Sequence, residues 1–318
     1  MSNVRALLIT KFGAPPEVRD VETPVPGEGE TLLRLLAAGL NPVDLAIGSG
    51  RFYMPLPQPP FVAGGEAVAE VVSSTRFAAG THVWVLQQHG SFADVFTCSD
   101  STLVPVPDGV TPSVAVAMGI AGLAGWMSVR SRGELRAGET VLVLGASGAV
   151  GQVAIQAARL GGAGRIVAAM RNPDGADRAR ALGAHAVVLL GGEDDTKSLQ
   201  AACLPGATLV VDTLWGAPIV AALPALAPRA RIVQVGGGAS PIVEFPAGPL
   251  RGGRIDIRGF SVFNERQSDL AQSFQELAAA AGRGEVVMPI EKIPLADGAE
   301  AWARQAAGTG GVKLVLIP

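Results

Sequence analysis

Residues 141–151, VLVLGASGAVG, combine residue types and spacing that can bind a phosphate group. An unbroken apolar run, Val141 to Leu144, leads directly into a glycine-rich turn, and apolar residues recur at helical spacing beyond it. A side chain at Gly148 or Gly151 would obstruct a pyrophosphate or the packing of the helix on the strand. The free N–H groups and the positive dipole end of the helix attract phosphate. The turn therefore predicts a dinucleotide site.

The fingerprint in this turn is imperfect, because Ala146 stands where the first glycine of G-x-G-x-x-G is usual, with Gly145 before it. Its context supports the dinucleotide interpretation, since a helix follows and a second apolar run, Ile166 to Met170, ends about 20 residues beyond the turn. The alternative is a glycine-rich turn that binds nothing. The predicted cofactor residues in the turn are Ala146, Ser147, Gly148, Ala149, Val150 and Gly151.

The residues that follow the second apolar run predict the choice of cofactor. NAD sites usually place Asp or Glu there to bind the ribose 2′-hydroxyl. This chain has Arg171 and Asn172 instead, with Arg178 on the next predicted helix. Because arginine binds a 2′-phosphate through paired donors, NADPH is the predicted cofactor. The alternative for both arginines is an ordinary solvated charge.

The composition of the chain limits its class and its partners. With 318 residues, 48% of them hydrophobic and 17% charged, it is typical of a folded α/β enzyme. A net charge of −3 without a stripe of Lys and Arg disfavours nucleic acid and anionic membranes as partners. The N-terminus lacks the features of a signal peptide, and we expect no apolar stretch long enough to span a bilayer. The sequence therefore predicts a cytoplasmic protein.

A small antiparallel β-barrel is predicted before the glycine turn, because short apolar runs alternate there with proline-rich turns. The expected strands are Val4 to Ile9, Thr31 to Leu36, Phe61 to Val72, Val83 to Leu86 and Phe92 to Phe96. A helix is expected to begin at Pro112, with Thr111 as its cap.

Strands and helices alternate after Asn172, which predicts a doubly wound parallel sheet. The expected elements are helix Ala176 to Leu182, strand Ala186 to Leu190, helix Lys197 to Cys203, strand Thr208 to Asp212, helix Ala217 to Leu226, strand Arg231 to Gly236, a last strand, Arg254 to Phe263, and helix Ser268 to Ala281. The tail, Glu291 to Pro318, leaves this alternation, so we expect it to return to the first domain. The predicted nucleotide domain, residues 123–263, is thus inserted into a domain formed by residues 1–122 and 264–318.

Seven short segments carry a family resemblance: AAGLNPVD at 37–44, GGE at 64–66, GSFA at 90–93, AGLAGW at 121–126, the glycine turn, RGFS at 258–261 and VKLVL at 312–316. With them, nearly the whole chain resembles the zinc-free NADPH:quinone oxidoreductases related to zeta-crystallin, a branch of the medium-chain dehydrogenase/reductase family. The resemblance implies an α/β fold in which a Rossmann domain is inserted into a GroES-like barrel domain.

The metal ligands of the zinc-dependent members of this family do not recur in the sequence. Those members carry a histidine where this chain has Gly65, and a cysteine near the position of Asn41. Cys98 and Cys203 stand far apart and the three histidines are scattered, so three protein ligands for a catalytic zinc are not predicted. Without a Lewis acid, reducing a quinone or an activated C=C bond is favoured over oxidising an alcohol. A zinc alcohol dehydrogenase is therefore disfavoured.

The resemblance also implies individual site residues. These are Asn41 and Tyr53 in the substrate pocket beside the nicotinamide, Gly236, Phe260, Ser261 and Phe263 near the nicotinamide end of the cofactor, and Lys313 at the domain junction. Two departures are Ala124, where the family often has threonine, and Val312, where a glycine commonly precedes the lysine. From the residues alone, Asn41 could form an Asx turn, and Tyr53 could be a packed ring with a surface hydroxyl.

The main hypothesis is an NADPH-dependent reductase of quinones or α,β-unsaturated carbonyls. Hydride would pass from a nicotinamide held between the domains, while Asn41 and Tyr53 donate hydrogen bonds to the substrate oxygen. The alternative is a non-catalytic NADPH-binding protein of the same fold. A homodimer is also expected, because the last predicted strand should lie at a sheet edge and carries four apolar residues: Ile255, Ile257, Phe260 and Val262.

Overall fold

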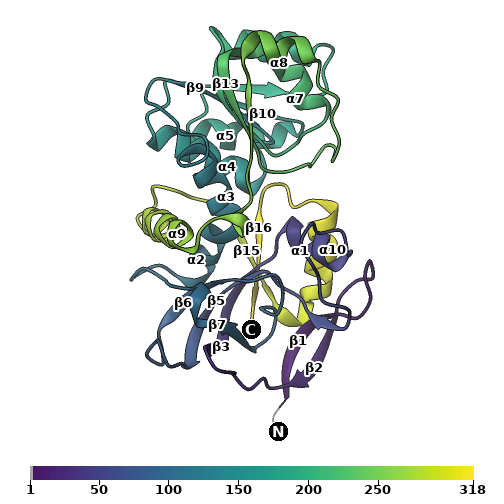
Figure 1. Ribbon diagram of the computed structural model, residues 1–318, viewed down its shortest axis with the longest axis vertical. Coiled ribbons are helices and arrows are strands. Elements are labelled where there is room, and N and C mark those ends of the chain that lie inside the picture. The colour runs from purple at the N-terminus through teal and green to yellow at the C-terminus, as the bar shows by residue number, and fades with distance from the viewer. Residues whose placement is uncertain (1–2) are drawn as a thin grey trace. The chain divides into compact units, whose positions relative to one another are not determined.

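The computed structural model describes residues 3–318 (Figure 1). Contacts between Cα atoms divide the chain into two compact units. The unit that we call terminal contains the chain up to Ala121 and from Arg266 onward, and the inserted unit is Gly122–Glu265. The helical stretch Pro112–Val129 is, against expectation, long and apolar enough to cross a membrane, but 89% of it is buried inside the protein. It therefore has the character of a core helix.

The terminal unit contains two β-sheets. One has the strand order β2-β1-β4, and the other has the order β15-β16-β3-β5-β6-β8, with β7 also paired to β3. The strands are β1 (Asn3–Ile9), β2 (Glu17–Glu22), β3 (Glu30–Gly39), β4 (Phe61–Val62), β5 (Glu66–Ser73), β6 (His82–Leu86), β7 (Val95–Ser99), β8 (Leu103–Pro105), β15 (Ile290–Pro294) and β16 (Lys313–Ile317). Strand β16 pairs antiparallel with β3, which confirms that the tail returns to the first part of the chain.

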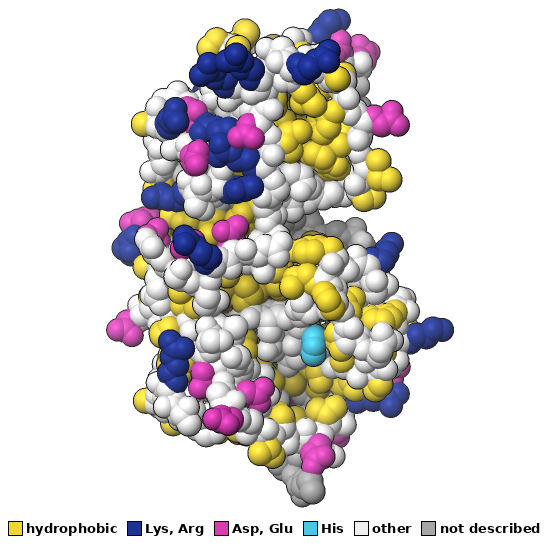
Figure 2. Space-filling view, viewed as in Figure 1, with side chains coloured by type: hydrophobic (Ala, Val, Ile, Leu, Met, Phe, Trp, Pro, Cys, Tyr) yellow, Lys and Arg dark blue, Asp and Glu magenta, His cyan; other side chains and the backbone are white. Residues whose placement is uncertain are grey.

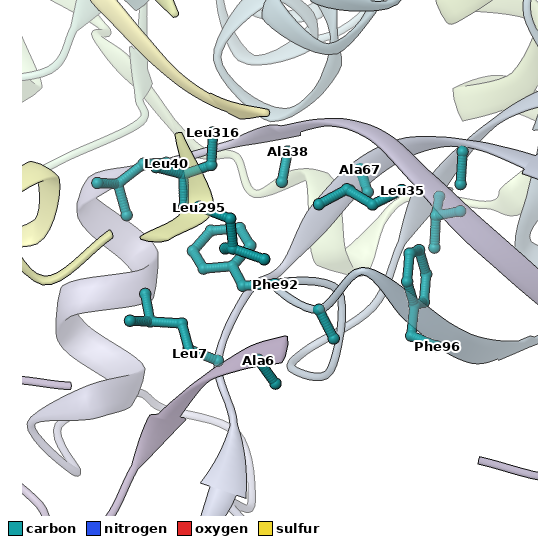
Figure 3. Close-up of a cluster of buried hydrophobic side chains, with 14 of the residues drawn as sticks. Ala6, Leu7, Leu35, Ala38, Leu40, Ala67, Phe92, Phe96, Leu295 and Leu316 are labelled. Atoms are coloured by element: carbon teal, nitrogen blue, oxygen red, sulfur yellow. The ribbon is translucent and has the colours of Figure 1, made fainter. Parts of the chain in front are cut away.

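Alternating burial along the strands builds the core of the terminal unit. In β3 the side chains of Leu33, Leu35 and Ala37 are at most 1% exposed, while Arg34 between them is exposed, as a period of two requires. Figure 3 shows side chains from β1, β3, β5 and β16 meeting around Phe92. The helices of this unit are α1 (Pro42–Gly48), α2 (Pro112–Ala117), α9 (Gln267–Gly282) and α10 (Gly298–Ala307).

Three expectations for the terminal unit were wrong. The run Phe61 to Val72 is two strands, because Gly64 has φ +102° and a Cβ there would lie 2.2 Å from the ring of Phe92. Phe92 is not in a strand, since its backbone bridges Ala63 and Leu7 instead. Thr111 occupies the N-cap position of α2, but its side chain makes no capping hydrogen bond.

The inserted unit is built on one parallel sheet with the strand order β11-β10-β9-β12-β13-β14. Its strands are β9 (Thr140–Leu144), β10 (Arg165–Met170), β11 (Ala186–Leu189), β12 (Ala207–Asp212), β13 (Leu226–Gln234) and β14 (Asp256–Gly259). Its helices are α3 (Leu123–Val129), α4 (Ala149–Leu160), α5 (Ala176–Leu182), α6 (Asp195–Cys203), α7 (Ala217–Ala222) and α8 (Ala247–Gly253). The chain winds outward in both directions from the pair β9 and β12, so the topological switch point lies there. The predicted doubly wound sheet is confirmed.

Strand β14 lies at the predicted edge of the sheet but is shorter than expected. Arg254 has φ +52° and ends α8, so the strand begins only at Asp256. Of the four apolar residues expected on this edge, Ile257 is 39% exposed, whereas Phe260 and Val262 are buried. The helix expected to end at Leu226 also stops early, at Ala222, and a 3₁₀ turn (Leu223–Ala225) containing a proline follows it.

The packing of α4 against β9 at the glycine turn can be tested directly. A Cβ on Gly151 would lie 2.4 Å from the carbonyl oxygen of Gly145, whereas a Cβ on Gly148 would lie 3.4 Å from the same atom. We expect Gly151→Ala to lower the free energy of unfolding by about 1–3 kcal/mol, since backbone must shift. Gly148→Ala should lower it less, by about 0.5–1 kcal/mol, because no backbone must shift and alanine is only a poorer N-cap than glycine. Urea unfolding measures both, and equal losses would contradict this packing.

Candidate functional site

The glycine turn lies where β9 ends and α4 begins, at the switch point of the sheet. Gly145 has φ +84°, and a Cβ there would lie 2.0 Å from the hydroxyl oxygen of Thr213. Gly148 is the N-cap of α4, and no side chain caps that helix. Its first-turn N–H groups and its dipole therefore favour an anion at this end. The predicted order of strand, turn, helix and strand is confirmed by β9, α4 and β10.

Gly148 has no conformational reason to be glycine. Its φ of −74° and ψ of 164° are open to any L residue, and a Cβ at this position would approach only the Gly145 oxygen, at 3.4 Å. The fold thus tolerates a side chain that would project into the space in front of the turn. A glycine at such a position fits a ligand that approaches the backbone closely.

The residues predicted to choose the cofactor follow β10. Arg171 is exposed and makes no hydrogen bond or ion pair with any residue that the structure describes. The Oδ1 of Asn172 accepts a hydrogen bond from the N–H of Asp174 at 2.9 Å, so this side chain caps a short 3₁₀ turn. Arg178 lies half-buried on α5. Arg171 is thus the cation directly at the carboxyl end of β10.

The other predicted cofactor residues lie at the carboxyl ends of neighbouring strands. Gly236 follows β13, and its N–H lies 3.3 Å from the carbonyl oxygen of Asp212. Phe260 follows β14 and donates its N–H to Gln234 at 2.9 Å, and Ser261 and Phe263 come directly after it. Because the strands are parallel, these residues and the glycine turn lie at the same end of the sheet, where the strands have their carboxyl ends. Ligands of open α/β sheets bind outside this end of the strands.

The terminal unit contains a buried polar cluster around Glu66, a residue to which sequence reasoning gave no role. One carboxylate oxygen of Glu66 accepts hydrogen bonds from the Asn41 amide at 2.8 Å and from the Lys313 ammonium at 3.1 Å. The other accepts from the N–H of Ile120 at 2.6 Å and faces the Trp84 indole nitrogen at 3.4 Å. Glu66 and Trp84 are fully buried, and Asn41 and Lys313 are at most 3% exposed. We call Asn41, Glu66, Trp84 and Lys313 the Glu66 cluster.

Two glycines make room for the Glu66 cluster. A Cβ on Gly39 would lie 2.3 Å from one carboxylate oxygen of Glu66, and a Cβ on Gly119 would lie 2.1 Å from the other. Gly119 also breaks the helical backbone with ψ −122°, next to the N–H of Ile120 that binds Glu66. The only sequence signal for this arrangement was an acidic residue inside an apolar run, together with a lysine at the start of another.

The catalytic role predicted for Asn41 needs a free amide hydrogen, and the structure corrects that prediction. Its Nδ2 donates to the carbonyl oxygen of Gly39 at 2.9 Å as well as to Glu66, and its Oδ1 accepts from Lys313. Both amide hydrogens are therefore used inside the unit. Tyr53 differs, since it is 63% exposed in the loop after α1, with its ring packed 4.5 Å from that of Phe52.

The residues present do not fit a catalytic zinc. Within residues 3–318, no group of three or more His, Cys, Asp or Glu side chains is arranged to hold a metal ion. The N–H of Gly65 donates to Asp44 at 2.8 Å, and Gly65 offers no side-chain ligand. Lys313 already supplies the positive charge that balances the buried Glu66. The Lys313 ammonium lies 3.1 Å from the Glu66 carboxylate, so the buried charge of Glu66 has a cationic partner within the unit.

Comparisons with known proteins agree with this architecture. Residues 27–108 match the alcohol dehydrogenase GroES-like domain, and residues 149–280 match the zinc-binding dehydrogenase family model. The chain is 30% identical to a quinone oxidoreductase of Sus scrofa over 98% of this chain and 97% of the relative. It is 28% identical to prostaglandin reductase-3 of Mus musculus over 86% of this chain and 74% of the relative.

Solved structures share the fold over the whole chain. A quinone oxidoreductase of Pseudomonas syringae pv. Tomato has a TM-score of 0.89 at 27% identity, covering 99% of this chain and 100% of that one. A mycobacterial protein solved in complex with NADPH has a TM-score of 0.87 at 25% identity, with the same coverage.

Asp44, beside the Glu66 cluster, predicts a pH dependence of stability. Burial raises the pKa of Asp44 to about 7, against the lowering effect of its hydrogen bonds and of Lys313. The folded state therefore binds more protons than the unfolded state between about pH 4 and pH 7, and the free energy of unfolding falls as pH rises through this window. From pH 6 to pH 8 we expect Asp44 to account for a loss of about 1 kcal/mol.

Urea unfolding at pH 6 and pH 8 measures this loss. Asp44→Asn should reduce the difference between the two pH values, whatever its effect on stability at either one. Asp177→Asn, at a side chain that is 99% exposed, is the control and should leave the difference unchanged. An undiminished difference in Asp44→Asn would assign the pH dependence to other groups.

Proposed function

Because the chain belongs to the medium-chain dehydrogenase/reductase family, we propose that it transfers hydride from NADPH to quinones or α,β-unsaturated carbonyl compounds. The observation that carries this proposal is the glycine turn at the switch point of the sheet, in a chain similar over nearly its whole length to a quinone oxidoreductase. Members of this family bind NAD(P), and one structural neighbour was solved with NADPH.

The inserted unit supplies the groups that would hold NADPH. The open space in front of Gly148 admits the pyrophosphate, and the N-terminus of α4 stabilises its charge. Arg171, at the end of β10, binds the 2′-phosphate through its fork of donors. When bound, NADPH supplies the hydride, while the protein binds and orients it. The alternative, a protein that binds NADPH without turnover, has the same site and differs only in activity.

The terminal unit supplies groups for the substrate. Negative charge develops on the carbonyl oxygen as hydride arrives, and that oxygen needs hydrogen-bond donors when no metal is present. Both amide hydrogens of Asn41 are used by its neighbours, so we assign the donor role to Tyr53 and a supporting role to Asn41. Quinones are intrinsically more reactive than enones, so they depend less on such a donor.

The activity is tested by following NADPH oxidation with a panel of quinones, enones and enals after dialysis against EDTA. We expect turnover with at least one quinone, because the described residues do not form a zinc site. Tyr53→Phe should slow enone reduction by up to about 10²-fold and quinone reduction less, with the dissociation constant for NADPH unchanged. Binding of NADPH without turnover across the panel would favour the non-catalytic alternative.

Cofactor choice is tested through the dissociation constants for NADPH and NADH. We expect tighter binding of NADPH, and Arg171→Glu should erase or reverse this preference by removing a contact worth about 1.5–3 kcal/mol. Arg180→Glu is the matched control, because Arg180 is exposed on α5 and paired with Asp177, and it should keep the preference. Equal constants for the two cofactors in the unmodified protein would rule out the role of Arg171.

We also propose that the protein forms a homodimer through the edge strand β14, in the cytoplasmic location that the sequence predicts. Among the described residues, no strand neighbours the outer side of β14, and Ile257 is 39% exposed on it. Light scattering at micromolar concentration should give the mass of a dimer. Ile257→Lys should weaken the dimer, whereas Val25→Lys, at a side chain 88% exposed in the terminal unit, should not. A monomer mass for the unmodified protein would disprove the proposal.

A further inference from the structure

The turn after β12 has an unfavourable backbone conformation in the inserted unit. Trp215 has φ +59° and Gly216 has φ +63°, so two successive residues lie in the left-handed region. A bulky residue such as tryptophan adopts that region rarely and at a cost of about 1–3 kcal/mol. Some interaction must therefore hold the turn in place.

The carboxylate of Asp212, the last residue of β12, provides that interaction. One of its oxygens accepts hydrogen bonds from the N–H of Leu214 at 2.8 Å and from the N–H of Trp215 at 3.0 Å. The side chain is fully buried, and its other oxygen has no hydrogen-bond partner within the described part of the chain. Burial raises the pKa of Asp212 to about 6, against the effect of the two N–H donors. Burying a carboxylate whose second oxygen has no partner costs free energy of folding. An apolar side chain at this position would avoid that cost, so packing of the core alone does not explain Asp212.

The same turn contacts the glycine turn on one side. The hydroxyl of Thr213 donates to the carbonyl oxygen of Leu144 at 2.9 Å, immediately before Gly145. Asp212 pairs with Leu144 in the register of β12 and β9. The turn therefore lies at the switch point, where a ligand of this sheet would bind.

On its other side the turn contacts the loop that follows β13. The N–H of Gly238 donates to the carbonyl oxygen of Thr213 at 3.0 Å, and the N–H of Ala239 donates to that of Leu214 at 2.7 Å. A Cβ on Gly216 would lie 2.8 Å from the Cβ of Ser240, so the two segments are in close contact. Gly216 and Ser240 also line a pocket of about 470 Å³, and Figure 2 shows hydrophobic side chains gathered over the region of α7 and α8.

We propose that Asp212 is a positioning residue of the dinucleotide site, whose carboxylate holds the turn at 213–216 and thereby fixes the glycine turn and the loop at 236–240 relative to each other. This inference rests on the proposed function, in which the inserted unit binds NADPH. Asp212 touches neither cofactor nor substrate in this role. It acts through the strained turn. A substitution at Asp212 should therefore alter the binding of the cofactor through both neighbouring segments.

The test measures the dissociation constant for NADPH in variants of Asp212 by fluorescence or calorimetry. Asp212→Leu keeps the branching at Cγ but removes both acceptors, and we expect it to weaken binding at least about tenfold. Asp212→Asn keeps an acceptor for both N–H groups and should stay within about threefold of the unmodified protein. Asp212→Ala replaces the leucine variant if that variant does not fold. Melting temperatures without NADPH are measured alongside.

The outcomes separate this inference from the proposed function. The positioning role is supported if the unmodified protein and Asp212→Asn bind NADPH tightly while Asp212→Leu or Asp212→Ala loses NADPH affinity. Unchanged NADPH affinity in the Leu or Ala variant, with or without a lower melting temperature, would reduce Asp212 to a structural residue and overturn the inference alone. Failure of the unmodified protein to bind NADPH would instead overturn the proposed function.

Discussion

The buried carboxylate of Glu66 is the group on which the polar interior of the terminal unit depends. A carboxylate removed from water must find partners for its oxygens, and Glu66 finds four donors on residues 41, 84, 120 and 313. These donors come from segments far apart in the sequence, including the last strand of the chain. Removing one partner of such a buried ion pair typically costs about 3–5 kcal/mol. The position of the C-terminal tail and the conformation around Asn41 are therefore linked through one side chain.

The need of the buried Glu66 carboxylate for hydrogen-bond donors also accounts for local features that look unrelated. The kink at Gly119 interrupts the helical backbone beside Ile120, whose N–H binds the carboxylate, and both Gly119 and Gly39 leave space that any side chain would fill. The ammonium of Lys313 balances the buried charge of Glu66. The same residues thus stabilise the fold and define the electrostatics of the unit.

Local pattern was enough to predict the inserted sheet, because each βα unit carries its own signal. The run Val141 to Leu144 predicted β9 to within one residue at each end, and the helical spacing after the turn predicted α4. The Glu66 cluster could not be predicted in this way, since Lys313 and Glu66 are 247 positions apart and no periodicity links them. The turn after Asp212 was missed for a related reason. Its strain and its contacts with two other segments are tertiary properties, visible in the sequence only as an acidic residue ending an apolar strand.

The position of Asn41 in the Glu66 cluster changes how a substitution there would have to be interpreted. Its amide joins Gly39, Glu66 and Lys313, so replacing it would leave a buried charge pair short of partners and would act first on stability. A loss of turnover in such a variant would not identify Asn41 as a donor to the substrate. Tyr53 is exposed and outside the cluster, so removing its hydroxyl should leave the fold intact. Of the two predicted catalytic residues, only Tyr53 can be tested for chemistry without first disturbing the structure that supports the site.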